Sequence, residues 1–154
     1  MKNSNNDQTE AIRENNQAKF AVLKRMNLPI DQYAIIGSGP LGIRNLREIG
    51  DIDIIVTPEL WASLAEKYGI TDTGSVKKII FPGGIIEAFW QESFYSDPKD
   101  PRDPIMAERI AQADIIDGLP FDTLQNVSYY KIKGGRDKDL KDIFLIQRFL
   151  RSEF

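Results

Sequence analysis

The stretch Tyr33-Ala-Ile-Ile-Gly-Ser-Gly-Pro40, followed by Gly50-Asp-Ile-Asp-Ile-Ile-Val56, decides the fold of this chain. The second segment is an apolar strand sequence interrupted by Asp51 and Asp53. Successive side chains on a strand point to opposite faces, so both carboxylates are expected on one face. Two like charges held so close are costly without a counter-cation. Since hard divalent cations prefer carboxylate oxygens, the segment predicts a strand that binds Mg²⁺ or Mn²⁺.

A Gly-Ser step, Gly37-Ser38, precedes the aspartates with twelve residues between Ser38 and Asp51. A glycine turn between a strand and a helix lets the backbone approach a ligand closely, and the start of a helix offers free N–H groups to phosphate. The Ser38 hydroxyl is a further candidate phosphate contact. The same residues are also typical of an ordinary tight turn, so the step gains its meaning from the aspartates that follow.

A third acidic residue, Glu87, is the one carboxylate in the apolar segment Gly84-Ile-Ile-Glu-Ala-Phe-Trp90. The preceding Pro82-Gly83-Gly84 favours a β-hairpin. If this strand lies beside the aspartate strand, Glu87 completes a three-carboxylate cluster, and two Mg²⁺ ions on it would hold a nucleoside triphosphate. The alternative is an exposed strand face for Glu87, and a strand end exposed to water for Asp51 and Asp53.

The rest of the pattern predicts a single α/β (α+β) domain over residues 1–154, a mixed sheet flanked by helices, with residues 1–8 disordered. Apolar residues at helical spacing include Ile12, Phe20, Leu23 and Met26 in the first helix and Leu140, Ile143, Phe144, Gln147 and Leu150 in the last. The expected helices are 9–26, 40–49, 58–69, 105–113 and 137–151, and the expected strands are 33–36, 51–56, 76–81, 85–90 and 114–116, with an exposed loop at 96–104 and a mixed segment at 119–130.

Composition excludes several kinds of chemistry. The chain has neither cysteine nor histidine, which removes disulfides, thiolate nucleophiles and His-ligated zinc. The net charge of −3 gives no argument for a nucleic-acid or membrane partner. No apolar run approaches the roughly 20 residues of a membrane span, and the Asn-rich start is unlike a signal peptide. We therefore expect a cytoplasmic protein that works through carboxylates, Lys, Arg, hydroxyls or a bound metal.

The order strand, Gly-Ser, helix, Asp-x-Asp and acidic hairpin strand resembles the DNA polymerase β-type nucleotidyltransferase superfamily over roughly residues 33–90. The resemblance implies that Gly37 and Ser38 bind the triphosphate, that Asp51 and Asp53 bind metal, and that Glu87 is the third catalytic carboxylate. Glutamate at the third place departs from the more common aspartate.

The segment Gly135-Arg-Asp-Lys-Asp-Leu-Lys-Asp142 is similar to the Arg-x-Lys-Asp-x-x-Asp segment of small bacterial nucleotidyltransferase-like proteins, including abortive-infection toxins. This similarity places Arg136 or Lys138 at the triphosphate. The alternative is a surface pair between Lys138 and Asp142, one helical turn apart. Arg44 and Arg47 are more typical of a solvated helix face.

These features predict a metal-dependent nucleotidyltransferase that moves a nucleoside monophosphate from an NTP to an acceptor hydroxyl on a protein, a tRNA or a small molecule. The alternative is a non-catalytic nucleotide-binding protein or an antitoxin-type partner. A partner protein or a homodimer is expected to supply further surface. Tyr129-Tyr-Lys-Ile-Lys133 could contact a nucleobase, although an ordinary strand explains the same residues. Trp61 and Trp90 are expected in the core or partly buried.

Overall fold

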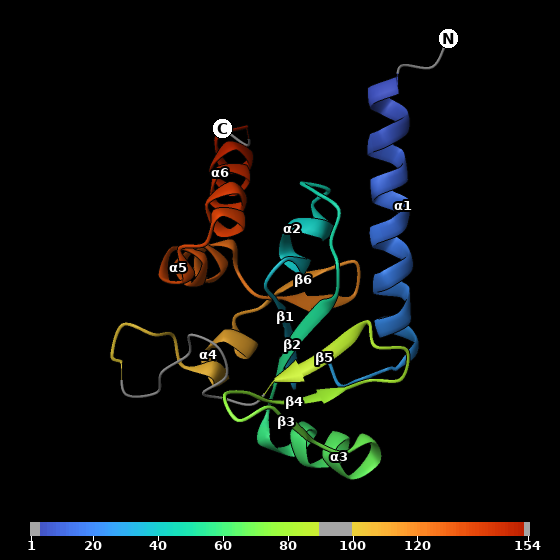
Figure 1. The fold of residues 1–154 in the computed structure, drawn as a ribbon, viewed down its shortest axis with the longest axis vertical. Coiled ribbons are helices and arrows are strands. Elements are labelled where there is room, and N and C mark those ends of the chain that lie inside the picture. Colours follow the sequence, from blue (N-terminus) through green and yellow to red (C-terminus); the bar gives the residue numbers. More distant parts are fainter. Residues whose placement is uncertain (1–3, 90–99, 153–154) are drawn as a thin grey trace.

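A seven-stranded mixed sheet forms the centre of the protein, in the strand order β3-β4-β5-β2-β1-β7-β6 (Figure 1). The computed structural model describes residues 4–89 and 100–152. The strands are β1 (Tyr33–Ile36), β2 (Ile52–Val56), β3 (Thr71–Asp72), β4 (Lys77–Ile80), β5 (Ile86–Phe89), β6 (Asp114–Ile116) and β7 (Leu119–Phe121). The helices are α1 (Ser4–Arg25), α2 (Gly39–Ile43), α3 (Pro58–Tyr68), α4 (Met106–Ala111), α5 (Leu124–Gly134) and α6 (Asp137–Ser152).

The sheet contains both parallel and antiparallel neighbours around its central strands, β1 and β2. β2 is antiparallel to β1 but parallel to β5, and β1 is parallel to β7. β4 and β5 form the antiparallel hairpin that the Pro-Gly-Gly turn predicted, because Gly83 and Gly84 take the positive φ values such a turn requires. The predicted mixed sheet flanked by helices is confirmed, and its central strands are the ones predicted to carry the site.

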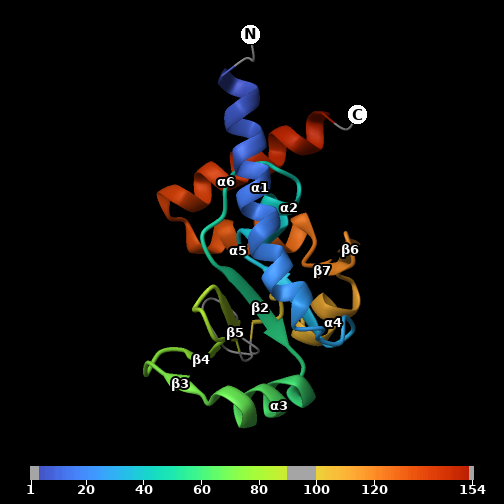
Figure 2. The same ribbon diagram turned by 90° about the vertical axis from the view of Figure 1, so that its right-hand side faces the viewer.

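The two faces of the sheet are covered by different helices (Figures 1 and 2). The main core lies between the sheet, α1 and α3, and includes Phe20 and Leu23 from α1 with Leu60 and Leu64 from α3. A smaller cluster on the other face joins Ala34 and Ile55 to Ile110 of α4. A third cluster joins α2 to α5 and α6 and consists of Leu41, Leu124, Val127 and Ile146. Burial of apolar side chains in these three clusters removes apolar surface from water, which is the main stabilising contribution to the fold.

Local sequence explains the best-predicted helix, α3. The hydroxyl of Thr57 accepts a hydrogen bond from the Leu60 N–H, and Pro58 occupies the first helical turn. Gly69 follows the last turn with φ of 79°, where a side chain would be strained. Leu60 and Leu64 then face the core one helical turn apart.

Three predicted boundaries differ from the structure. α1 begins at Ser4, five residues before the predicted start, and takes in much of the tail expected to be disordered. α2 ends at Ile43, because Asn45 adopts a positive φ of 58° that an α-helix cannot continue. Residues 129–133 belong to helix α5, which begins after the Thr123 cap, and not to a strand. Trp90 and part of the loop predicted at 96–104 lie outside the described residues.

The buried face of α6 also differs from the predicted apolar stripe. Leu140 and Phe144 are 55% and 62% exposed, whereas Asp139, Asp142 and Ile146 are buried. The carboxylates can face inward because basic side chains from other elements meet them there. Within residues 4–89 and 100–152, no helix has the length and apolarity to cross a membrane.

Candidate functional site

Asp53 and Glu87 are direct partners across the parallel pair β2 and β5, and we call them the carboxylate pair. Paired residues on neighbouring strands present their side chains to the same face of the sheet. Ile36 pairs with Asp53 on one side and Ile80 pairs with Glu87 on the other. This places two acidic side chains between two apolar ones on one row of the sheet, with the Glu87 strand beside the aspartate strand as the expected cluster required.

The Gly37-Ser38 turn lies against the same carboxylate pair. A Cβ atom added at Gly37 would be 3.8 Å from Asp53 Oδ2, and Gly37 has a φ of 67°. Glycine is therefore favoured by the backbone conformation, while a Cβ at this position would make only an ordinary van der Waals contact with the carboxylate. Ser38 precedes α2, and its side chain makes no helix-capping hydrogen bond. The structure thus brings the predicted phosphate turn and the predicted metal-binding strand together.

Electrostatics at the carboxylate pair disfavours the ionised form of Asp53. Burial, and then the charges of Glu87 and Asp51, raise the pKa of Asp53 to about 6, while Lys78 and Lys138 act in the opposite direction. Asp51 is exposed, immediately before β2. Lys78 of β4 lies 3.2 Å from Glu87 Oε1, with both side chains partly buried. Three negative charges therefore influence one another, and Lys78 balances them only in part.

The donor set fits a hard cation that is shared with a ligand. Across the described residues, 4–89 and 100–152, no three Asp, Glu, His or Cys side chains are grouped so that they could hold a metal ion by themselves. The structure thus shows a carboxylate pair with Asp51 nearby, rather than the closed three-carboxylate cluster predicted from sequence. Mg²⁺ commonly binds through one or two carboxylates together with substrate phosphates and water. The pair is suited to that arrangement.

The two predicted cationic residues at the start of α6 differ in their environment. Arg136 donates to Asp139, three residues further along the chain, through Nε (2.8 Å) and Nη2 (3.1 Å), and this ion pair holds its side chain. Lys138 is exposed, and its charge is one of those that lower the pKa of Asp53. The alternative pair of Lys138 with Asp142 does not form; Asp142 is bound by Arg47 and Lys131 instead. Of the two, Lys138 is the one whose charge reaches the carboxylate pair.

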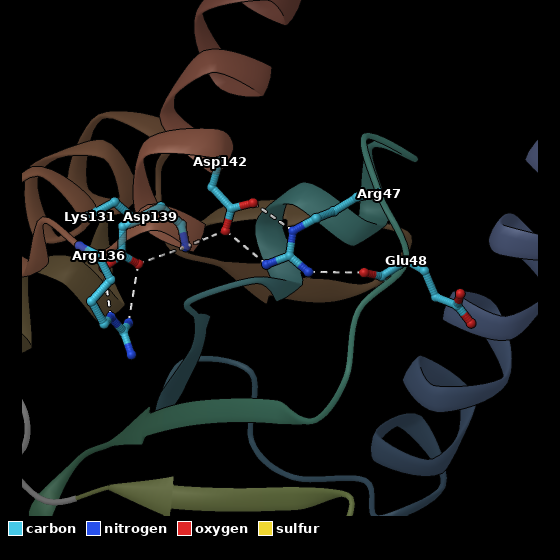
Figure 3. A network of polar contacts seen from close by, with 6 residues as sticks. All are labelled: Arg47, Glu48, Lys131, Arg136, Asp139 and Asp142. Carbon is cyan, nitrogen blue, oxygen red and sulfur yellow. Dashed lines mark hydrogen bonds and ion pairs between the residues drawn. The ribbon is translucent and has the colours of Figure 1, made fainter.

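A network of ion pairs connects α5 and α6 to the chain after α2 (Figure 3). Lys131 bonds to Asp142 and lies 3.9 Å from Asp139. Burial acts against ionisation of both carboxyls, but hydrogen bonds from Arg136 to Asp139, and from Arg47 and Lys131 to Asp142, bring both pKa values below the usual range. Arg47 is therefore partly exposed but held in an ion pair with a buried carboxylate, and is not the solvated residue that the sequence predicted.

Arg44 is likewise held to the protein. Its Nη1 donates to the Pro40 carbonyl at 2.8 Å, and its Nη2 lies 3.5 Å from Asp114. The guanidinium also lies 6.0 Å from the centre of the Phe149 ring. A side chain with these contacts orients α2 against β6 and α6, in contrast to the predicted solvated face.

Sequence reasoning missed three polar groups that support the site. Lys78 has no distinguishing motif, and its role follows only from the pairing of β4 with β5. Asn16 of α1 is 1% exposed and bonds to the chain between α2 and β2. Asp122 is fully buried directly after β7 and accepts from Arg109 of α4. An isolated polar residue in an apolar segment, as in Phe121-Asp122, was the available signal for the last of these.

The aromatic candidates lie elsewhere or have other partners. Trp61 of α3 is half-buried against the main core, as predicted. The Tyr129 hydroxyl donates to Asp103, and the Tyr130 ring lies under the Arg109 guanidinium at 4.3 Å. These contacts account for both tyrosines without a nucleobase.

Comparison with known proteins gives no relative: no family model, curated protein or solved structure matches the chain. The case for a function therefore depends on the geometry of the site itself.

Proposed function

We propose that this protein is a nucleotidyltransferase, which binds a nucleoside triphosphate with Mg²⁺ or Mn²⁺ and transfers its nucleoside monophosphate to an acceptor hydroxyl. The observation that carries the proposal is the direct pairing of Asp53 with Glu87, beside a glycine turn where a Cβ at Gly37 would be 3.8 Å from Asp53 Oδ2. The Gly37-Ser38 turn lies beside carboxylates whose negative charge is only partly balanced. Such a site suits a triphosphate that binds together with a divalent cation.

Each residue has a defined part in this proposal. Asp51 and Asp53 bind the cation, Gly37 and Ser38 seat the β- and γ-phosphates, and Lys138, with Arg136, balances phosphate charge. The bound cation supplies charge neutralisation and a lower pKa for the acceptor hydroxyl. The acceptor oxygen forms a bond to the α-phosphorus while the bond from that phosphorus to the β-phosphate oxygen breaks and pyrophosphate leaves. Glu87 accepts the hydroxyl proton.

The acceptor is a hydroxyl of a protein, a tRNA or a small molecule. A partner protein or a second copy of the chain supplies additional surface for it. No described helix could serve as a membrane span, so the proposal needs no membrane and fits a cytoplasmic location.

Nucleotide binding and transfer are tested separately. We expect ATP to bind in the presence of Mg²⁺ and to be released when EDTA removes the metal, as measured by isothermal titration calorimetry. Asp53→Asn should abolish this binding, while Asp31→Asn, at an exposed site, serves as the control. Each labelled NTP is then incubated with protein and cell lysate, and transfer is read as a labelled acceptor. Metal-independent binding, or wild-type binding by Asp53→Asn, would contradict the proposal.

A second candidate function is nucleotide binding without transfer, as in an antitoxin-type partner protein. The ion pair of Lys78 with Glu87 favours it, because a glutamate held by a lysine is less free to reach an acceptor hydroxyl. Metal-dependent binding with every NTP, but no labelled product from any lysate, would support this second function over transfer.

A further inference from the structure

The chain between α2 and β2, residues 44–51, connects the glycine turn to the aspartate strand and carries Asp51 at its end. We call it the α2–β2 connection. It has no helix or strand of its own. Ile49 packs back on α2 so closely that a Cβ at Gly42 would be 2.5 Å from Ile49 Cγ2. The path of the α2–β2 connection therefore determines where Asp51 lies relative to Gly37 and Ser38.

One buried amide on α1 holds both ends of this connection. Asn16 Nδ2 donates to the carbonyls of Gly42 (3.3 Å) and Arg47 (2.9 Å). Asn16 Oδ1 accepts from the Ile49 N–H at 3.0 Å. Lys19, one turn further along α1, donates to the Ile49 carbonyl. Buried backbone groups need such partners, and here α1 provides the partners that the connection cannot provide for itself.

On the opposite side, α6 holds the same connection through a buried carboxylate (Figure 3). Asp142 accepts from Arg47 Nε at 2.6 Å and Nη2 at 2.8 Å, and from Lys131 at 2.7 Å. Arg47 Nη1 donates to the Glu48 carbonyl at 2.9 Å. The two-pronged Arg–carboxylate contact fixes orientation as well as distance. The same contact sets α6, and with it Lys138, relative to the connection.

We infer that Asn16 and Asp142 are positioning residues for the nucleotide site, although neither touches the carboxylate pair. Asn16 acts through the backbone that leads to Asp51, and Asp142 acts through Arg47. This inference rests on the proposed function, because the position of Asp51 matters only if a cation and a triphosphate bind there. Changes to groups that orient metal ligands commonly reduce metal affinity about 10–100-fold.

The test measures the dissociation constant of Mn²⁺·ATP, by Mn²⁺ electron paramagnetic resonance and calorimetry, well below the melting temperature of each variant. We expect Asn16→Ala and Asp142→Asn each to weaken binding at least tenfold. Asn15→Ala is the matched control, since Asn15 bonds only to the exposed Glu48 side chain among the contacts described, and should change binding less than twofold. If Asn16→Ala fails to fold, Lys19→Met, which removes the bond from α1 to the Ile49 carbonyl, should show a smaller loss in the same direction.

A double mutant separates positioning from a general loss of structure. If Asn16 acts through Asp51, Asn16→Ala should cost less than a further twofold in an Asp51→Asn background. Independent, multiplicative losses would overturn the inference. Equal Mn²⁺·ATP affinity in wild type and Asn16→Ala would also overturn it while leaving the proposed function in place. A wild-type chain that does not bind Mn²⁺·ATP would overturn the proposed function and this inference together.

Discussion

Replacing Asp53 by asparagine should stabilise the metal-free protein at neutral pH while it removes the proposed function. In the folded chain, burial and the charges of Glu87 and Asp51 raise the pKa of Asp53 to about 6, from an ordinary value of 3.8. At 1.36 kcal/mol for each pKa unit, this rise corresponds to at most about 3 kcal/mol. Since water reaches part of this side chain, we expect Asp53→Asn to raise the free energy of unfolding by about 1–3 kcal/mol at pH 7.5.

The sign follows from proton binding. Because the folded pKa is the higher one, the folded state holds more protons than the unfolded state between pH 3.8 and about 6. The wild-type stability contributed by this group is therefore complete below pH 3.8 and is lost as the pH rises through 6. The difference between Asp53→Asn and wild type should be nearly absent at pH 4 and fully developed at pH 7.5.

Urea unfolding in EDTA, followed by circular dichroism at pH 4.0 and 7.5, measures this difference. Asp31→Asn is the control, because an exposed substitution of this kind usually changes stability by less than about 0.5 kcal/mol. Adding Mg²⁺ and ATP should reverse the order, since only wild type gains stability from binding. The reasoning is refuted if Asp53→Asn destabilises the protein at pH 7.5, or if its effect is the same at both pH values.

Three further changes test other parts of the structure. Arg109→Leu leaves the fully buried Asp122 without its cation, and urea unfolding should show a loss of about 3–5 kcal/mol; a loss below 1 kcal/mol would contradict the assigned ion pair. Gly39→Ala places a Cβ 2.3 Å from a side-chain carbon of β1 and should cost about 1–3 kcal/mol, whereas Gly50→Ala, with open space around it, should cost less in the same assay. Lys78→Gln removes the cation beside the β5 carboxylate, so Mn²⁺ titration should show at least about fivefold tighter binding, because one charge about 4 Å away contributes about 1 kcal/mol even when it is screened as strongly as in water; weaker binding would argue against an effect of that carboxylate on the cation.

Local pattern was sufficient for the strands that carry the site. β1, β2 and the β4–β5 hairpin follow from apolar runs and glycine turns, and β5 lies beside β2 as the expected cluster required, whereas the register that pairs Asp53 with Glu87 comes from the structure. The end of α2 was not predictable in this way, because it depends on a positive φ at Asn45 in a context set by distant contacts. Local periodicity also predicted the wrong buried face for α6, because distant basic side chains bind the carboxylates on that face.

Long-range partners decide which polar residues are buried. Asp142 appeared to be a surface residue because its partner Arg47 is 95 positions away in sequence. Asn16 gave no signal at all, since one of its three bonds goes to a backbone carbonyl of α2 and the other two go to backbone groups of a segment without regular structure. Periodicity in a sequence indicates the average polarity of one face of a helix or strand. It does not identify a buried charged residue that is paired with a distant partner, because that partner is known only from the folded structure.

The separation of Arg47 from Asp142 also has a consequence for the newly synthesised chain. At about 5–20 residues per second, a ribosome adds the 95 intervening positions in about 5–20 s. By the end of that interval β1, β2 and β5 have been made, but the carboxylate that fixes the α2–β2 connection is only then added. We expect nascent chains that stop before α6 to be unable to bind nucleotide, so that any activity appears only after release of the helix from the translation machinery.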